Sequence, residues 1–326
     1  MSDVGRVFVT GALGFIGQAL SERYRAQGAQ VVGMDVRPDP GLGVVAGDVS
    51  RPGDWQRHAE GCDLLVHTAA IVSMRNQPET VWRANALGTR HAVDAAVRAG
   101  ARRFLHLSSV TVFSFEFPDG VTERHPVRPN GVPYVDSKVA SEQVVLAAHA
   151  SGELPCTVMR PGDVYGPGSR PWTILPVEEI ARRRFLLPAM GRGTFSPAYV
   201  DNVVDGIVLA AASDEAAGQV FNVSDGHGVT TGQFFGHYGR MLGRRVAVAP
   251  TRVARVLAGG VSAAARARGK ETEINASGVD YLARTGTYSI AKARTVLGYE
   301  PAVGLDEGMR RTEAWLRESG RLPGGA

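Results

Sequence analysis

Hydrophobic residues in the first half of the chain alternate between short β-rich runs and longer stretches with helical spacing. The runs predict buried strands over residues 6–10, 30–34, 63–67, 103–107 and 156–159. The stretches between them predict helices over residues 15–27, 78–99 and 134–150. Strands that alternate with helices build a parallel sheet covered on both faces, so we expect an α/β fold with a doubly wound sheet.

The pattern loosens after Pro161, where Pro and Gly residues indicate loops as far as Gly193. Further helices are predicted over residues 200–212, 230–242, 251–268 and 305–319, with a short strand near 219–223. We therefore divide the chain into a sheet domain, residues 1–165, and a smaller substrate-binding lobe, residues 166–326. Some segments of the lobe are expected to return to the sheet.

The composition is typical of a soluble globular protein with a sizeable core. Of the 326 residues, 44% are hydrophobic, and the 36 basic and 32 acidic residues leave a formal net charge of only +4. So small an excess indicates no nucleic-acid partner. The run Arg182, Arg183 and Arg184 is interpreted as a solvated helix end, with contact to a phosphate as the alternative. Cys62 and Cys156 have neither disulfide-framework nor metal-ligand spacing, so no metal is expected.

The N-terminal stretch from Met1 to Gly5 lacks the basic start and apolar run of a signal peptide. No uninterrupted apolar stretch reaches the length of a membrane span. A cytoplasmic location is the expectation that follows.

Three glycines follow the first predicted strand directly. Gly11, Gly14 and Gly17 open the first helix with GxxGxxG spacing. Such glycines allow a tight turn, a close approach of the backbone to a pyrophosphate and close packing of helix on strand. The N-terminus of the helix adds free N–H groups and a partial positive charge, which predicts a dinucleotide site here.

An acidic residue ends the second predicted strand. Asp35 lies 18 residues after Gly17, where a carboxylate can accept hydrogen bonds from the adenosine ribose and repel a 2′-phosphate. NAD is therefore favoured as the cofactor. NADP stays an alternative, because Arg37 lies two residues further on and can reach a 2′-phosphate.

A tyrosine and a lysine stand four residues apart at the start of a predicted helix. Tyr134 and Lys138 therefore share one face of that helix. A free phenol has a pKa of about 10, and a nearby ammonium is expected to lower it, so that the phenol can exchange a proton with an alcohol. Ser108 and Ser109 end the strand over 103–107 and would emerge at the same edge of the sheet, where a hydroxyl can orient a substrate oxygen.

In this order along the chain, these features resemble the extended short-chain dehydrogenase/reductase family, the NAD-dependent epimerase/dehydratase superfamily. The resemblance rests on segments spread from residue 10 to residue 301. They are TGALGFIG at 10–17, GDV at 47–49, HTAA at 67–70, NALGT at 85–89, LSSV at 107–110, RPGDVYGP at 160–167, AYVDNVVD at 198–205 and ARTVLGYEP at 293–301.

The resemblance implies a Rossmann fold, a bound dinucleotide and, frequently, a homodimer. It identifies Ser109, Tyr134 and Lys138 as catalytic. The cofactor contacts that it implies are Gly11, Gly14, Phe15, Ile16, Gly17, Asp35, Arg37, Asp48, Val49, Thr68, Ala69, Ala70, Asn85, Tyr134, Lys138, Pro161, Gly162 and Val164. The substrate contacts that it implies are Ile71, Val110, Phe113 and Asp163.

Departures from the family pattern bear on the substrate. Asp163 stands where nucleotide-sugar enzymes carry an Asn, and the segment 194–199 lacks their diphosphate-binding Arg. Val110 and Thr111 follow Ser109, whereas dehydratases carry Asp-Glu there. Three phenylalanines lie at 113–117, and residues 251–269 form a basic amphipathic stretch that can line an apolar pocket; ordinary packing explains both equally well.

We therefore expect an oxidoreductase that transfers a hydride between a nicotinamide and a hydrophobic secondary alcohol or ketone, similar to the 3β-hydroxysteroid dehydrogenase branch. A nucleotide-sugar epimerase or dehydratase is the first alternative. A dinucleotide-binding sensor without catalysis is the second.

Overall fold

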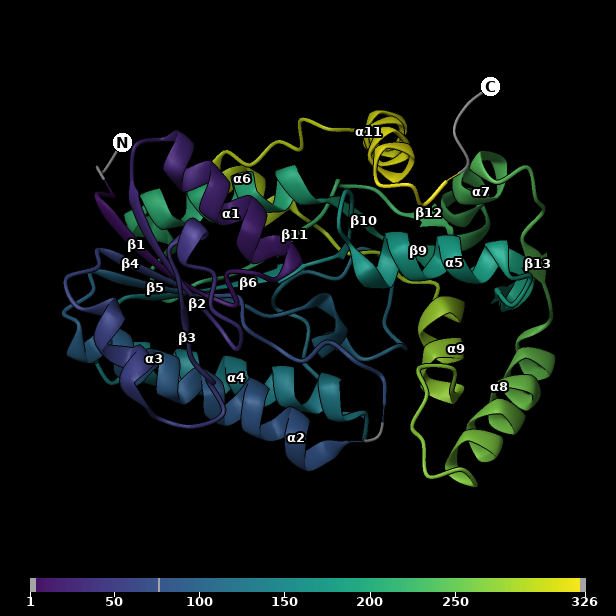
Figure 1. Cartoon of the computed structure of the whole chain (residues 1–326), viewed down its shortest axis with the longest axis horizontal. Coiled ribbons are helices and arrows are strands. Elements are labelled where there is room, and N and C mark those ends of the chain that lie inside the picture. The colour runs from purple at the N-terminus through teal and green to yellow at the C-terminus, as the bar shows by residue number, and fades with distance from the viewer. Residues whose placement is uncertain (1–3, 76, 323–326) are drawn as a thin grey trace.

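The computed structural model describes residues 4–75 and 77–322. The first residues of the N-terminal stretch, for which no leader is predicted, lie outside the described residues. Figure 1 shows a sheet with helices on both sides, beside a second, mostly helical lobe. None of the helices in the described part of the chain is long and apolar enough to cross a membrane.

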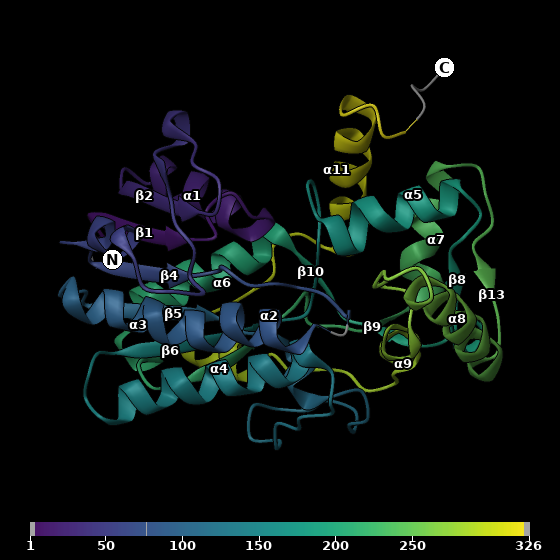
Figure 2. The ribbon, with the colours of Figure 1, turned by 60° about the horizontal axis from the view of Figure 1, so that its bottom comes forward.

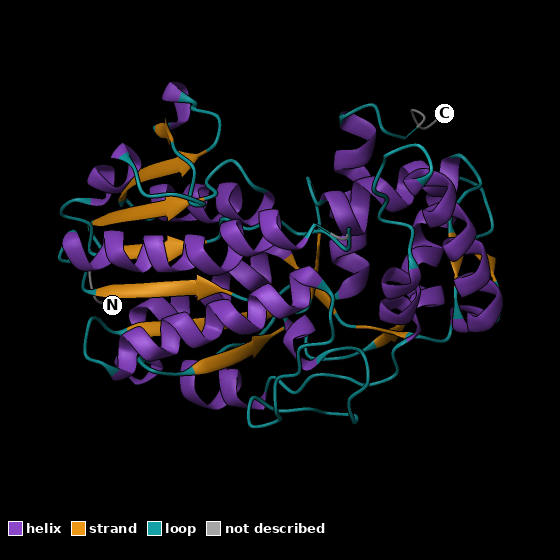
Figure 3. Cartoon of the chain, turned by 90° about the horizontal axis from the view of Figure 1, so that it is seen from below, coloured by secondary structure: helices purple, strands orange, loops and turns teal. Residues whose placement is uncertain are grey.

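The sheet is parallel and, within the described residues, has seven strands in the order β11-β6-β5-β4-β1-β2-β3. Every neighbouring pair is parallel, which confirms the predicted doubly wound sheet. The arrows in Figure 3 accordingly point one way, toward the lobe. The strands are β1 (Arg6–Thr10), β2 (Gln30–Asp35), β3 (Val44–Ala46), β4 (Leu64–His67), β5 (Arg103–Leu107), β6 (Cys156–Pro161) and β11 (Val220–Val223).

Helices cover both faces of the sheet because alternate side chains of each strand point to opposite faces. Val7 and Val9 of β1 belong to the apolar core on one face, and Phe8 between them belongs to the core on the other face. The helices α1 and α6 pack together above the sheet in Figure 1, and α2, α3 and α4 lie below it. Their bounds are α1 (Phe15–Ala26), α2 (Pro78–Trp82), α3 (Gly88–Arg98), α4 (Pro133–Ala150) and α6 (Val200–Ala212).

The stretch 78–99 is not the single helix that its spacing predicts. A π-helical turn over Arg83–Leu87 separates α2 from α3. A π turn inserts one extra residue into a helical turn, and such turns frequently occur at functional sites. This turn buries Asn85, whose role is described below.

The lobe contains short elements that the sequence pattern did not predict as well as helices that it did. The helices are α5 (Leu175–Ala181), α7 (Thr231–Met241), α8 (Thr251–Arg266), α9 (Ala276–Ala283), α10 (Ala291–Leu297) and α11 (Leu305–Glu318). The strands are β7 (Asp163–Tyr165), β8 (Leu186–Leu187), β9 (Thr194–Phe195), β10 (Pro197–Tyr199), β12 (Val229–Thr230) and β13 (Ala247–Val248). The expected loop through Gly193 is therefore wrong at α5 and at β7 to β8.

The chain returns from the lobe to the sheet. Strand β11 pairs with β6, with Val220 opposite Val158, and α6 packs beside α1. Residues 200–223 thus add a strand and a covering helix to the sheet. The domain boundary at residue 165 stays a prediction.

Candidate functional site

Polar segments from several strands meet at one edge of the sheet. The carboxyl ends of parallel strands share an edge, and ligands of open α/β folds collect there. Figure 2, which views the sheet at another angle, shows that the lobe begins at this edge. The predicted segments 11–17, 35–37, 47–49, 68–71, 108–109 and 161–164 lie at the ends of strands that finish here, whereas Tyr134 and Lys138 lie on α4.

The glycine turn after β1 has the close contacts that its sequence implies. Gly11 has φ +72° and donates its N–H to the Met34 carbonyl oxygen at 2.8 Å. A Cβ atom at Gly11 would lie 2.7 Å from Ala69 Cα, and one at Gly17 would collide with the Gly11 carbonyl oxygen. Gly14 caps α1 without any side-chain hydrogen bond, so the helix N-terminus is open to an anion. The backbone cradle therefore fits a dinucleotide pyrophosphate.

The predicted adenosine side of the site lies at the ends of β2 and β3. Asp35 Oδ2 accepts a hydrogen bond from Leu13 N at 3.1 Å, and Oδ1 accepts one from Val36 N at 2.8 Å. These bonds tie the carboxylate to the glycine turn. Arg37 is exposed, and Asp48 Oδ1 accepts from Ser50 N at 2.9 Å. Val49 is buried against Gly88, where α3 begins.

The segment after β4 approaches the glycine turn closely. Thr68 Oγ1 donates to the Thr10 carbonyl oxygen at 2.8 Å, which places Ala69 beside Gly11. Ala70 and Ile71 continue this segment and are partly buried. The predicted contacts at 68–71 thus line one side of the cradle.

Asn85 holds the segment 68–71 in place through hydrogen bonds and does not face the glycine turn. Its side chain is buried, with Oδ1 accepting from Ile71 N at 2.8 Å. Its Nδ2 donates to the Ile71 carbonyl oxygen and to Ser137 Oγ, each at 3.0 Å. Since these bonds use both amide hydrogens and Oδ1, the predicted cofactor contact at Asn85 is corrected to a positioning residue between β4 and α4.

The three predicted catalytic side chains lie together. Tyr134 and Lys138 point from the first turns of α4, and Ser109 follows β5. The Ser109 hydroxyl is hydrogen-bonded to the Tyr134 phenol, and Lys138 Nζ donates to the Leu107 carbonyl oxygen at 2.7 Å. All three are nearly buried. The arrangement can hold a substrate oxygen between a hydroxyl and a phenol.

The protein's own groups do not lower the pKa of Tyr134 as expected from its spacing to Lys138. Burial raises the pKa of Tyr134 to about 12, and the hydrogen bond from Ser109 opposes this only in part. Burial also lowers the pKa of Lys138 to about 8, which the Glu142 carboxylate opposes. At neutral pH Tyr134 is therefore a phenol and Lys138 an ammonium.

Two buried histidines beneath Lys138 are uncharged. Burial and the nearby Lys138 charge lower the pKa of His67 to about 3 and that of His106 well below its usual value. Thr89 Oγ1 donates to the Asn85 carbonyl oxygen, so it accepts the proton of His67 Nε2 at 3.1 Å. His67 Nδ1 then accepts from Thr10 Oγ1 at 2.7 Å. These residues form a structural hydrogen-bond chain from β1 to α3.

A buried ion pair lies beneath the predicted catalytic residues and was itself not predicted. Arg160 binds Glu142 in a bidentate manner, with Nε to Oε1 at 2.8 Å and a second nitrogen to Oε2 at 2.6 Å. Ser108 Oγ donates to the same Glu142 at 2.6 Å. Glu142 lies four residues after Lys138 and eight after Tyr134, so helical spacing places all three on one face. That spacing was the available signal.

Asp163 does not face the substrate side, which corrects the prediction for it. The side chain is completely buried, as is that of its ion-pair partner Arg284. The Tyr281 hydroxyl also donates to the carboxylate, and Ser196 N donates to Oδ2 at 2.8 Å. Its charge is balanced by Arg284, so it offers no free negative charge to repel a diphosphate.

Phe113 is likewise internal, and the prediction that it contacts substrate is corrected. Its ring is buried against Tyr288, with centroids 5.9 Å apart, and the Arg160 guanidinium lies 4.9 Å from the ring centroid. Val110 is buried in the same cluster. Phe115 behaves differently, because it is only partly buried and packs beside Tyr134.

The loop after β6 crosses the edge of the sheet. Pro161 and Val164 are buried, and Gly162 N donates to the Val223 carbonyl oxygen at 2.8 Å. A Cβ atom at Gly162 would lie 2.6 Å from the Ser196 carbonyl oxygen. The loop is thus held between β11 and the lobe.

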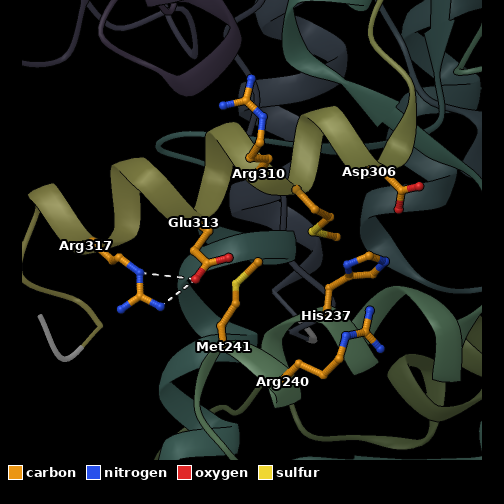
Figure 4. Close-up of a pocket in the computed structure, with 8 residues that line it drawn as sticks. His237, Arg240, Met241, Asp306, Arg310, Glu313 and Arg317 are labelled. Atoms are coloured by element: carbon orange, nitrogen blue, oxygen red, sulfur yellow. Dashed lines mark hydrogen bonds and ion pairs between the residues drawn. The ribbon is translucent and has the colours of Figure 1, made fainter. Parts of the chain in front are cut away.

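A hollow of about 310 Å³ lies elsewhere, between α7 and α11 (Figure 4). Arg317 and Glu313 on its wall are paired at 2.5 Å, and none of the predicted catalytic side chains lines it. The residues around it are His237, Arg240, Met241, Asp306, Met309, Arg310, Glu313 and Arg317.

Comparison with known proteins agrees with this geometry. Residues 7–224 match the model of the NAD dependent epimerase/dehydratase family. The chain belongs to this family and is an NAD-dependent enzyme of the extended short-chain dehydrogenase/reductase type. NAD is its cofactor. Membership of an enzyme family sets aside a sensor without catalysis.

The relatives act on different substrates by name. A ketoreductase of a farnesylated dihydroquinoline oxide from Stigmatella aurantiaca is 30% identical, over 98% of both chains. A 3-beta-hydroxysteroid dehydrogenase from Mycolicibacterium neoaurum is 28% identical, over 94% of this chain and 90% of that one. A UDP-glucose 4-epimerase from Vibrio cholerae is 28% identical, over 97% of both chains.

Solved structures share the fold. MoeE5 in complex with UDP-glucuronic acid and NAD superposes with a TM-score of 0.77 at 27% identity, covering 97% of this chain and 100% of that chain. The relatives therefore establish the enzyme class, while lipophilic alcohols or ketones and nucleotide sugars are both represented among them.

Proposed function

We propose that this enzyme transfers a hydride between NAD and a hydrophobic secondary alcohol or ketone, with Tyr134, Ser109 and Lys138 as catalytic residues. The observation that carries the proposal is the apolar surrounding of Tyr134. Its ring belongs to a cluster with Val132 and Val135, against which Met74 and Phe115 pack. A lipophilic carbon skeleton suits such a surrounding better than a charged diphosphate does.

The lobe beside this cluster supports the same substrate class. Tyr281 packs edge-on against Phe115, with centroids 5.6 Å apart, and stacks on Trp172 at the same distance. Arg284, the buried arginine behind Tyr281, is already neutralised by Asp163. A diphosphate would have to compete with that carboxylate for the guanidinium.

The catalytic residues have separate tasks in this reaction. Ser109 Oγ holds the substrate oxygen, and Tyr134 Oη gives its proton to that oxygen as a ketone is reduced to an alcohol. In the reverse direction, Tyr134 first loses its own proton, and the resulting phenolate oxygen receives the hydroxyl proton while the hydride of the same carbon leaves. NAD, when bound, accepts or supplies that hydride. Lys138 carries a buried positive charge near the site, where an ammonium can hold the ribose hydroxyls of the bound dinucleotide.

Turnover with a substrate panel tests the proposal. Purified protein is incubated with NAD or NADH and hydroxysteroids, hydroxyalkanoates or their ketones, and in parallel with UDP- and dTDP-sugars, while the nicotinamide absorbance and the sugar products are followed. Net oxidation or reduction of a lipophilic substrate is expected. Conversion of a nucleotide sugar without any lipophilic turnover would replace the proposal with the epimerase or dehydratase alternative.

The substitution Tyr134→Phe is expected to lower kcat about 100- to 10,000-fold, because it removes the proton donor. NAD binding, measured by fluorescence, should persist. The matched control is Tyr24→Phe, which removes a buried phenol oxygen that has no hydrogen-bond partner in the described chain. Equal activity of the Tyr134→Phe variant and the control would remove Tyr134 from the mechanism.

A further inference from the structure

The charge of the chain is unevenly distributed, although its total is small. Between Gly226 and Lys270 there are eight arginine or lysine residues and no aspartate or glutamate. The whole chain has a formal net charge of +4, so the rest of it is net negative. Five of the eight basic residues lie on α8 or directly after it, namely Arg252, Arg255, Arg266, Arg268 and Lys270. Arg255 is paired with Asp280 of α9 at 2.7 Å, so the other four carry the basic character of this surface.

Helix α8 also exposes an apolar face. Val256 is 75% exposed, and Val253, Leu257 and Val261 are each about half exposed. Spacings of three, one and four residues place these four side chains on one face of the helix. A shallow hollow lined by Arg252, Val253, Val256 and Leu257 lies on this face. We call these four aliphatic side chains the α8 apolar face.

Little of α8 is used for packing within the chain. Only Ala254 and Ala258 are buried, and α8 lies beside α9. Figure 1 shows the two helices extending from the lobe on the side away from α11, with α8 outermost. The apolar face is therefore not the inner side of a helix packed against the sheet or against the rest of the lobe.

We infer that α8 docks the enzyme on an anionic lipid surface, with its apolar face inserted among the lipids and its basic residues against the headgroups. A helix with an exposed aliphatic face and a basic flank has the composition of an interfacial helix. Each basic residue near an anionic surface adds favourable electrostatic energy. A nucleic acid would use the basic residues but would leave the four aliphatic side chains in water.

The position of α8 relative to the site gives this docking a consequence for the enzyme. The segment between α8 and α9 contacts the loop after β4, where Glu273 accepts from Ser73 Oγ at 2.7 Å and from Met74 N at 2.9 Å. Asn275 Nδ2 donates to the Met74 carbonyl oxygen at 2.7 Å. Because Met74 packs against the apolar cluster that contains Tyr134, a docked α8 would hold that cluster close to the lipid surface. The docking itself does not depend on the proposed substrate.

Vesicle flotation with the full chain tests the inference. Phosphatidylcholine vesicles with and without phosphatidylglycerol are compared at about 0.1 M and about 1 M salt, between which the Debye length falls from about 10 Å to about 3 Å. Binding to the anionic vesicles at low salt, weakened at least about tenfold at high salt, is expected. Failure to bind them, or equal binding to both vesicle types, would overturn the inference.

Two sets of variants separate the contribution of the α8 apolar face to vesicle binding from that of the basic residues. V256E/L257E is expected to lower the partition coefficient at least about tenfold, and R266E/R268E/K270E by a similar factor with loss of the salt dependence. The matched control L42E/V97E changes two exposed aliphatic residues far from α8 and should bind as the unmodified chain does. NAD binding by every variant reports that the fold is kept.

Two other occupants of the α8 apolar face give different results. If the face joins two copies of the chain, sedimentation will show a dimer that V256E/L257E dissociates, without vesicle binding. If the basic residues bind nucleic acid, an oligonucleotide will bind equally well to V256E/L257E and to the unmodified chain, again without vesicle binding. Either result would overturn the inference.

Discussion

Two buried ion pairs on one short segment, Arg160 to Asp163, belong to different halves of the molecule. Arg160 lies beneath the proposed catalytic residues and pairs with Glu142 of α4. Asp163 lies at the start of β7 and pairs with Arg284 at the end of α9. Both pairs exclude water almost completely, yet they join elements of very different size.

The pair of Arg160 and Glu142 joins elements of the sheet domain, and the pair of Asp163 and Arg284 joins a short segment of the lobe. Glu142 also binds Ser108, so its pair connects α4, β5 and β6 within the sheet domain. Through Asp163, Arg284 and Tyr281 tie the α9 segment to the loop over the site. Breaking a buried pair leaves an uncompensated charge, and the cost depends on how much structure must open to hydrate that charge.

The largest effect is expected from Arg160→Met. This change leaves the Glu142 carboxylate buried without its partner and should lower the free energy of unfolding by about 3–5 kcal/mol, measured by urea denaturation. The double variant Glu142→Leu/Arg160→Met removes both charges and should recover most of the loss. If the Arg160→Met variant were as stable as the unmodified chain, the pair of Arg160 and Glu142 would not contribute to stability as described.

A smaller and local effect is expected from Asp163→Asn. Arg284 then loses its charged partner, but the α9 segment can open and hydrate it, so we expect a loss of about 1–3 kcal/mol. Hydrogen exchange should accelerate at the amides of α9, while those of β5 and β6 keep their protection. Equal acceleration in all three elements would show that the two pairs do not differ in the way described.

The smallest effect concerns proton binding at Lys138. Burial lowers the pKa of Lys138 to about 8, and the negative charge of Glu142 opposes this decrease. Glu142→Gln removes that charge and should lower the pKa of Lys138 further. If the ammonium is required for turnover, the alkaline decline of kcat/KM should move to lower pH.

The matched variant Asp163→Asn should leave that decline in place, since Asp163 is not among the groups that shift the pKa of Lys138. The same pKa bears on stability. The pKa of Lys138 is lower in the folded chain than its ordinary value of 10.5, so burial of the ammonium destabilises the folded chain. This destabilisation has its full size below about pH 8 and decreases as the pH rises toward 10.5. A decline that moves equally in both variants would exclude a specific coupling to Glu142.

Much of the fold was predictable because its signals are local. The strands β1, β5 and β11 and the helices α1, α4, α6 and α7 were predicted to within two residues, since each strand is a short apolar run and each helix carries apolar residues at helical spacing. The π turn over Arg83–Leu87 was missed, because the apolar spacing around it still matches a helix. The two-residue strands of the lobe carry too few positions for any period to appear.

The site also contains residues that the sequence predicted and residues that it did not. Ser109, Tyr134 and Lys138 are brought together because strand ends share an edge and residues four apart share a helix face. Glu142 had the same helical signal. Arg284 had none, because it meets Asp163 from 121 positions away, and a carboxylate in the sequence gives no sign of being neutralised by a distant residue. That is why Asp163 was taken for a substrate contact.

The spacing of Arg160 and Asp163 restricts how the length of the chain can change here. Adding or removing one residue between them would turn one of the two side chains to the opposite side, because successive side chains along an extended backbone point in opposite directions. One partner would then be left buried and unpaired. Relatives that diverge at this place should therefore do so by exchanging Glu142 or Arg284 together with its partner, while the number of residues in the connection stays constant.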